Sequence, residues 1–284
     1  MNPALLIVGH GSSDIVGAQE FRAFTERVGK RMEARDIAVA GGFIELSPPP
    51  LTDAVRVLIG RGHRRIAAVP LMLVAAGHAK GDIPAALARE RERHPGLTVA
   101  YGRPLGPHPS VLSLLRERFS GFDGDTVLLV GRGSTDPDAN AEVAKVARLL
   151  AETTSTGGLA GVEYAFVSLA PPGVAAGLER CRRLGAARIA VLPYFLFPGV
   201  LPDRVKSQAT AWASEHPGVE VRCAPVLGDT ETLADMVIER YDEALAGDIR
   251  MNCDTCIYRV ALPNFESRVG AAQHPHDHPH DHPH

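Results

Sequence analysis

The sequence predicts an α/β protein of two similar domains, each a doubly wound four-stranded parallel sheet, with an irregular, His-rich C-terminal tail. Short continuous apolar runs alternate with segments of helical periodicity, which is typical of parallel strands buried on both faces and joined by helices. The whole pattern occurs twice along the chain. The 284 residues, 45% hydrophobic and 22% charged, suffice for two domains of about 100–150 residues each.

In the first half, predicted strands and helices alternate along the chain. Apolar runs predict strands at residues 5–8, 66–69 and 97–100, and a further strand leads into residues 43–45. Helical spacing predicts helices at residues 19–34, 52–59, 83–93 and 111–119. The prolines at residues 48–50 mark a helix start, because proline is tolerated in the first helical turn.

Five motifs of the first half recur after about 120 residues, far beyond the 20–50 residue periods of solenoid repeats. Residues 5–12 return as 127–134, 43–49 as 166–172, 62–70 as 185–193, 94–96 as 216–218 and 105–106 as 227–228. The repeated unit is therefore a whole domain. We expect domains at residues 1–122 and 123–247, divided within the polar segment 120–125, and a separate tail at residues 248–284.

Composition argues against several classes of protein. The net charge is only −3, aromatic residues are few and no basic tract is present, so a nucleic-acid partner is not expected. No apolar run approaches the ~20 residues of a membrane span, and the first apolar run is too short for a signal peptide. Four cysteines make no secreted-type disulfide framework in a chain of this length. We expect a cytoplasmic protein, as a monomer or a homodimer.

Three side chains capable of binding a metal follow strands of the first half. Ligands bind beyond the carboxyl ends of the strands in open parallel sheets. His10 follows the first strand, Glu45 the second, and His78 lies in the Gly- and Ala-rich loop after the third. Two imidazoles and a carboxylate suit a divalent first-row transition metal, and histidine exchanges protons near neutral pH. The alternatives are hydrogen-bonded core histidines and a solvated carboxylate.

The second half serves as an internal control for these three residues. Arg132 stands where His10 would recur, Ser168 stands at the place of Glu45, and residues 197–202 contain no histidine. If the three residues supported only the scaffold, at least one would be expected to survive in the copy. The sequence therefore predicts a single metal site, in the first half.

At these residues the sequence resembles the type II chelatases, specifically the long-form sirohydrochlorin chelatases of the CbiX family, over about residues 4–245. The motifs that carry the resemblance are residues 9–12 (GHGS), 43–45 (FIE) with the prolines that follow, 69–71 (VPL), 77–78 (GH), 82–84 (DIP) and 102–106 (GRPLG). The resemblance implies that the protein inserts a divalent metal ion into sirohydrochlorin, for cobalamin or sirohaem biosynthesis. Co²⁺ is the expected metal, and Fe²⁺ is the alternative. The family's metal-site histidines carry over to His10 and His78, and its acidic residue to Glu45.

As a mechanism for this substrate, we expect the two domains to clamp a carboxylate-edged tetrapyrrole. His10 and His78 present the metal and accept the departing pyrrole protons, while Glu45 completes the site or relays protons outward. Arg132, Arg103 and Lys80 are the expected ligands of the substrate's carboxylates, since a guanidinium binds a carboxylate through two parallel hydrogen bonds.

The tail contains a Cys-x-x-Cys motif, Cys253 and Cys256, which resembles an iron–sulfur segment of some family members. Such clusters usually need four cysteines, and Cys181 and Cys223 lie in predicted helix and strand, so two chains would each have to donate a pair. Histidines alternate with Pro and Asp at residues 274–284. This composition predicts a disordered segment that binds metal loosely, or a purification tag.

Other functions remain open from the sequence. Gly9 and Gly11 after a strand mimic a dinucleotide-binding motif, but Asp14 replaces its third glycine and would repel a phosphate. A non-catalytic cobalt or nickel metallochaperone, or a metal store built on the tail, would explain the histidines but not the duplicated sheet. His and carboxylate ligands accept both cobalt and iron, so the residues do not choose between the two metals.

Overall fold

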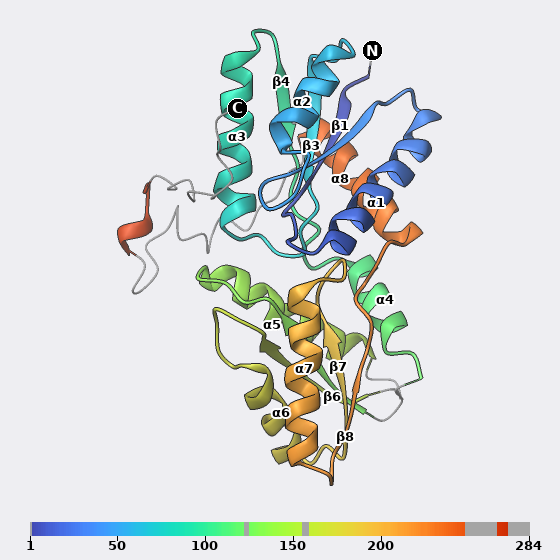
Figure 1. Cartoon of the computed structure of the whole chain (residues 1–284), viewed down its shortest axis with the longest axis vertical. Coiled ribbons are helices and arrows are strands. Elements are labelled where there is room, and N and C mark those ends of the chain that lie inside the picture. Colours follow the sequence, from blue (N-terminus) through green and yellow to red (C-terminus); the bar gives the residue numbers. More distant parts are fainter. Residues whose placement is uncertain (1, 122–124, 155–158, 248–265, 272–284) are drawn as a thin grey trace. The chain divides into compact units, whose positions relative to one another are not determined.

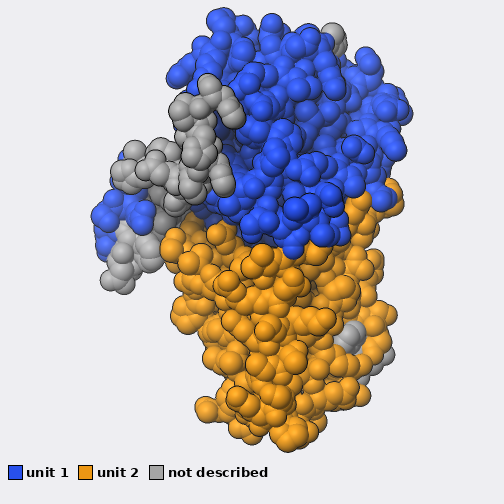
Figure 2. Space-filling view, in the orientation of Figure 1, with its two compact units in different colours: residues 1–105, 234–284 blue, residues 106–233 orange. Residues whose placement is uncertain are grey.

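The computed structural model describes residues 2–121, 125–154, 159–247 and 266–271 (Figure 1). The chain forms two compact units, one of residues 1–105 and 234–284 and one of residues 106–233 (Figure 2). Cys253, Cys256 and the histidines from residue 274 onward lie outside the described residues, so the expectations for them stay predictions.

The first unit is built on a four-stranded parallel sheet of order β2-β1-β3-β4. The strands are β1 (Ala4–Gly9), β2 (Val39–Phe43), β3 (Arg65–Pro70) and β4 (Thr98–Tyr101). Every residue of β1 is buried, as expected of a central strand covered on both faces. In the register of the sheet, Val8 of β1 lies opposite Gly42 and Pro70, so β1 ends beside the ends of both neighbours.

Helices cover both faces of this sheet (Figure 1). They are α1 (Ile15–Glu33), α2 (Leu51–Gly60), a π-helix η1 (His78–Asp82), α3 (Ile83–Arg93) and α8 (Glu231–Ala246). Apolar residues of α2 and α3 share one core cluster with β1 and β3. On the other face, Arg31 and Arg35 of α1 form ion pairs with Asp235 and Asp242 of α8.

The second unit repeats the sheet with the order β6-β5-β7-β8, again all parallel. Its elements are α4 (Pro109–Arg118), β5 (Asp125–Gly131), α5 (Pro137–Thr154), β6 (Leu159–Phe166), α6 (Val174–Arg183), β7 (Arg188–Pro193), α7 (Val200–Glu215) and β8 (Glu220–Cys223). A short 3-10 helix, η3 (Glu266–Arg268), is described beyond α8. The predicted fold of two doubly wound parallel sheets is confirmed.

Local signals explain where the helices of the first unit begin. The side chain of Asp14 accepts a hydrogen bond of 2.7 Å from the backbone N–H of Val16 and caps α1. Helix α2 begins at Leu51, directly after the predicted proline run, with Pro50 as its N-cap. The segment expected as a loop before α3 contains the π-helix instead, because its Gly- and Ala-rich sequence has no apolar period from which a helix could be predicted.

The last helix of each sequence repeat belongs to the unit of the other repeat. The predicted domains, residues 1–122 and 123–247, follow the repeat. The compact units have other boundaries than these domains, because α4 is part of the second unit and nearly all of α8 is part of the first. The two repeats have therefore exchanged their final helices, and similarity between repeats carries no information about which sheet such a helix covers.

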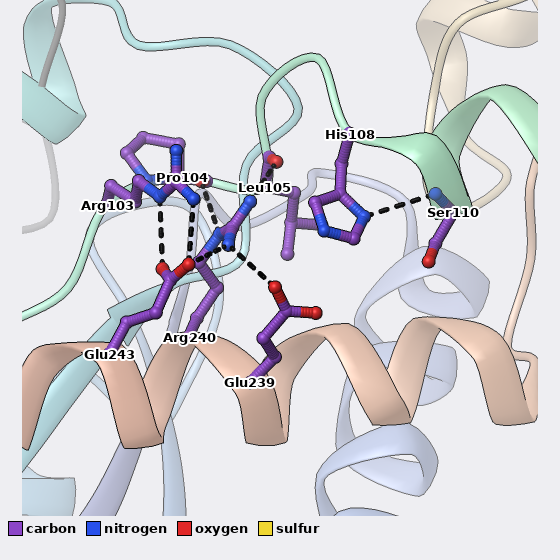
Figure 3. A network of polar contacts seen from close by, with 8 residues as sticks. All are labelled: Arg103, Pro104, Leu105, His108, Ser110, Glu239, Arg240 and Glu243. Atoms are coloured by element: carbon purple, nitrogen blue, oxygen red, sulfur yellow. Dashed lines mark hydrogen bonds and ion pairs between the residues drawn. The ribbon is translucent and has the colours of Figure 1, made fainter. Parts of the chain in front are cut away.

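A buried arginine attaches α8 to the first unit (Figure 3). Arg240 is 1% exposed and donates hydrogen bonds to the carbonyl oxygens of Pro104 (3.2 Å) and Leu105 (3.0 Å). Its third contact is an ion pair of 2.9 Å with Glu243, which also accepts two hydrogen bonds from Arg103. Burial, with the like charge of Arg103, lowers the pKa of Arg240 against the opposing effect of Glu243. This network joins the end of the first repeat's sheet to the last helix of the second.

Arg240→Met should lower the free energy of unfolding by about 2–4 kcal/mol, because two backbone acceptors lose their donor in a buried site. Urea unfolding followed by circular dichroism measures the change. Arg148→Met is the matched control, since Arg148 pairs with Glu152 on the surface of α5 at 77% side-chain exposure, and should cost less than about 0.5 kcal/mol. Equal losses in both variants would show that Arg240 does not hold α8.

Candidate metal site

Three residues from three strand ends meet at the carboxyl edge of the first sheet. His10 directly follows β1, Glu45 lies just after β2, and His78 opens the π-helix that follows β3. The Nε2 atom of His10 is 3.1 Å from Oε1 of Glu45, and Nε2 of His78 is 3.6 Å from the same oxygen. One potential ligand atom from each residue lies within 4.8 Å of the other two. The two nitrogens and one oxygen could hold a single first-row divalent ion.

The backbone after β1 and β2 places His10 and Glu45 side by side. The N–H of Ile44 donates to the carbonyl of Gly9 (2.9 Å), and that of Glu45 donates to the carbonyl of His10 (3.1 Å). Gly11 has a φ of 102°, and a Cβ built there would stand 1.8 Å from the carbonyl oxygen of Glu45. Only glycine permits this approach, so Gly11 is what allows the two ligand-bearing segments to touch.

The second repeat keeps this backbone and lacks the ligands. Gly133 has a φ of 86°, and its Cβ would stand 1.9 Å from the carbonyl oxygen of Ser168. The N–H of Ser168 donates to the carbonyl of Arg132, the counterpart of the bond between Glu45 and His10. The scaffold is therefore the same in both repeats, while His10 and Glu45 occur only in the first.

Both histidines direct Nε2 toward Glu45 because an oxygen lies at Nδ1 of each ring. Nδ1 of His10 is 3.2 Å from the carbonyl oxygen of Gly11, and Nδ1 of His78 is 2.6 Å from Oδ2 of Asp82. With a metal ion on Nε2, the one hydrogen of each neutral ring stands on Nδ1 and points at this oxygen, which accepts it. The rings stand nearly perpendicular, at 86°, with centroids 4.6 Å apart.

The π-helix that carries His78 is tied to the core. Its wide turn is closed by the N–H of Ile83, which donates to the carbonyl of His78. The phenol of Tyr101, on β4, donates a hydrogen bond of 2.7 Å to the carbonyl of Ala79, which is fully buried. Burial raises the pKa of Tyr101 well above its usual range. Single π-turns of this kind occur frequently at functional sites.

The site is half-buried, and its charges act on one another. The exposed side-chain fractions are 30% for His10, 12% for Glu45 and 15% for His78. Burial alone would lower the pKa of His78, but the carboxylates of Glu45 and Asp82 outweigh it and raise that pKa above its ordinary value. The same negative charge that attracts a proton to His78 also attracts a divalent cation.

The three cations expected to bind substrate lie in different surroundings. Lys80 belongs to the π-helix and is half-buried. Arg103 follows β4 and makes two hydrogen bonds to Glu243, of 3.0 and 2.7 Å (Figure 3). A substrate carboxylate would have to displace Glu243 to use this guanidinium. Arg132 directly follows β5 in the second unit and is exposed.

Several residues of the site were not singled out from the sequence. Asp82 lies four residues after His78, the spacing at which helical side chains meet, but the segment was expected to be a loop. Tyr101 lies just beyond the predicted strand at residues 97–100, and no sequence pattern marked it. Leu46, next to Glu45, is 46% exposed and has a φ of 61°, a left-handed conformation that is rare for leucine.

The described cysteines are not poised to bind metal. Cys181 is fully buried in α6, and burial raises the pKa of its thiol to about 12. Burial also raises the pKa of Cys223, on β8. A thiolate is the form that binds metal, so both positions disfavour a cluster.

In the part of the chain that the structure describes, no helix is both long and apolar enough to span a membrane.

The sequence and the fold are similar to those of known chelatases. The model of the CbiX family matches residues 4–121 and 126–244. A sirohydrochlorin cobaltochelatase of Priestia megaterium is 36% identical over 267 residues, which cover 91% of this chain and 85% of that protein. A sirohydrochlorin ferrochelatase of the same organism is 36% identical over 210 residues, 72% of this chain and 77% of that protein.

Solved structures agree with these matches. The sirohydrochlorin chelatase SirB from Bacillus subtilis subspecies spizizenii, in complex with cobalt, superposes with a TM-score of 0.73 at 28% identity, covering 87% of this chain and 97% of that one. SirB from Bacillus subtilis with Fe³⁺ gives a TM-score of 0.74 at the same identity and coverage.

The raised pKa of His78 makes the stability of the metal-free protein depend on pH. Below about pH 6.5, the unfolded value, His78 is protonated in both states and its contacts with Glu45 and Asp82 stabilise the fold fully. That contribution is lost as the pH rises through the folded pKa. The difference in unfolding free energy between wild type and His78→Gln should therefore be larger at pH 6 than at pH 9, in urea titrations with a chelator present. A difference that grows with pH would contradict the assignment.

Proposed function

The chain belongs to the CbiX family, and we propose that it is an enzyme that inserts a divalent metal ion, Co²⁺ or Fe²⁺, into sirohydrochlorin. The observation that carries the proposal is the convergence of His10, Glu45 and His78 at one sheet edge of the first repeat. Support comes from relatives named as a cobaltochelatase and a ferrochelatase of sirohydrochlorin, each 36% identical to this chain. Metal insertion into this tetrapyrrole fits a site of two imidazoles and one carboxylate.

Insertion requires the ion to leave its water for the ring nitrogens while two pyrrole N–H protons leave the ring. In the proposed mechanism, Nε2 of His10, Nε2 of His78 and a Glu45 oxygen hold the incoming ion on one face of the macrocycle. As the ring nitrogens take the ion, these ligands are released and accept the two protons, which then pass to solvent. The raised pKa of His78 makes it a competent acceptor near neutral pH.

The carboxylates of the substrate need cations to bind them. Lys80 of the first unit and Arg132 of the second are the proposed contacts, because an ammonium or guanidinium can pair with a carboxylate. Arg103 is proposed as a weaker candidate, since Glu243 already occupies its guanidinium. We place the enzyme in the cytoplasm, as a monomer or a homodimer, with no nucleic-acid or membrane partner, in line with its net charge of −3.

An exposed apolar side chain lies beside the proposed ligands and suits the apolar face of a macrocycle. Leu46 follows Glu45, and its Cβ would stand 3.4 Å from a Cβ at Gly11. Its left-handed backbone conformation raises the free energy of the folded state by about 1–2 kcal/mol. At 46% exposure, burial of its side chain offsets little of this. Leu169, its counterpart in the second repeat, has a φ of 60°, so the turn belongs to the shared scaffold. At Leu46 the turn lies next to the metal ligands, where a bound ring can cover the side chain.

His10→Ala and His78→Ala should each lower metal insertion at least about 100-fold and leave the fold intact, because each removes one ligand and one proton acceptor. The measurement is an anaerobic absorbance assay of sirohydrochlorin with Co²⁺ and Fe²⁺ offered in turn, which also gives the preferred metal. His94→Ala is the matched control, since His94 caps the end of α3 and precedes β4, away from the strands' carboxyl ends. Wild-type rates in His10→Ala would remove the proposed role.

Leu46→Asn should raise the KM for sirohydrochlorin about 3–10-fold with little change in kcat, because burial of half a leucine side chain is worth roughly 1 kcal/mol. Asparagine tolerates the left-handed conformation, so stability should stay equal or rise. Leu184→Asn is the control, an exposed leucine between α6 and β7 at the amino end of the second sheet. An unchanged KM in Leu46→Asn would show that substrate does not cover this residue.

A further inference from the structure

Asp82 makes the shortest contact within the candidate metal site, and neither insertion nor substrate binding uses it directly. We infer that Asp82 is the positioning residue of His78: it holds the imidazole in one orientation and one tautomer, with the lone pair of Nε2 presented to the metal. This inference rests on the proposed function only in assigning His78 to the metal.

The contact between the two side chains is close and shielded. Nδ1 of His78 lies 2.6 Å from Oδ2 of Asp82, and the side chains are 15% and 14% exposed. The neutral ring carries one hydrogen. Asp82 lies 2.6 Å from Nδ1 and Glu45 lies 3.6 Å from Nε2, so the nearer carboxylate favours the hydrogen on Nδ1 and leaves the lone pair on Nε2. A carboxylate behind a ligating histidine is a frequent arrangement in metal sites, where it orients the ring and strengthens it as a donor.

The backbone of Asp82 is anchored, so its carboxylate can impose an orientation. Asp82 ends the π-helix and precedes Ile83, which is fully buried in the core cluster of the first unit. The hydrogen bond from Tyr101 to Ala79 holds the other side of the same turn. A ligand held from a rigid element keeps its geometry better than one held from a mobile loop.

His10 provides an internal comparison, because its Nδ1 lies near only a neutral acceptor among the contacts described. That acceptor is the carbonyl oxygen of the adjacent Gly11, at 3.2 Å, and His10 is twice as exposed as His78, 30% against 15%. In the second repeat, α7 begins as a regular α-helix at Val200, where no histidine stands. Of these two corresponding segments, only the one that contains a histidine forms a π-turn among the described residues.

The test is a Co²⁺ titration of the full chain, followed by the visible absorption of the bound ion, for wild type, Asp82→Ala and Asp82→Asn. Asp82→Ala should weaken Co²⁺ binding about 10–100-fold while the circular-dichroism spectrum stays that of the folded wild type. Asp82→Asn should fall between the two, because an amide oxygen still accepts the Nδ1 hydrogen. Imidazole ¹⁵N spectra of the metal-free protein, recorded at a pH where His78 is neutral, should show the hydrogen mainly on Nδ1 in wild type. In Asp82→Ala the hydrogen should shift toward Nε2, the side of Glu45.

Glu163→Gln is the matched control, since it removes one carboxylate from an ion pair with Arg180 in the second unit and should leave Co²⁺ affinity unchanged. Wild-type affinity and an unchanged tautomer population in Asp82→Ala would overturn the inference, as would a wild type that binds no Co²⁺. Should Asp82→Ala fail to fold, Asp82→Asn decides: wild-type affinity together with an unchanged tautomer population also overturns it.

These measurements separate the inference from the proposed function, because they use no tetrapyrrole. A protein with the expected Asp82 pattern but no metal insertion would contradict the function and leave the inference standing. If the wild type inserts metal but Asp82→Ala keeps the wild-type Co²⁺ affinity and His78 tautomer, the inference is contradicted and the proposed function stands.

Discussion

The contact of Gly11 with the carbonyl of Glu45 is the constraint on which the site depends. Parallel pairing of β1 and β2 continues past both strands through two backbone hydrogen bonds, and the absent Cβ at Gly11 lets the segments touch. The main chain thereby places His10 and Glu45 side by side, with Nε2 of His10 3.1 Å from Oε1 of Glu45. The second repeat has the same contact at Gly133 with different side chains, so the scaffold is separable from the chemistry that it carries.

The third proposed ligand, His78, is held by different means. His78 does not extend a strand; it stands on a π-turn that is tied down by Tyr101 and by the buried start of α3. Its ring is oriented by the carboxylate of Asp82, whereas the ring of His10 faces a backbone carbonyl. Two imidazoles with unlike surroundings therefore share one Glu45 oxygen. His10 is the more exposed of the two, at 30% against 15%.

Much of the fold could be predicted because its signals are local. Continuous apolar runs predicted the buried strands, and the repeat predicted two like sheets. The exchange of α4 and α8 could not be predicted, because it depends on Arg240 meeting the carbonyls of Pro104 and Leu105, a contact between distant segments. Asp82 was missed for a related reason: its spacing from His78 has meaning only on a helix, and a Gly- and Ala-rich segment has no helical period. The occupation of Arg103 by Glu243 likewise depends on where α8 packs.

The central claim is that one ion binds between His10, Glu45 and His78 and that the second repeat holds none in its corresponding place. Crystals of the full chain soaked anaerobically with Co²⁺ and measured at the cobalt absorption edge test this claim directly. The account predicts one anomalous peak about 2.0–2.2 Å from Nε2 of each histidine and from a Glu45 oxygen, the usual lengths for nitrogen and carboxylate ligands of such ions. A strong peak beside Arg132 and Ser168, or a triad that stays empty while cobalt binds elsewhere on the chain, would contradict it.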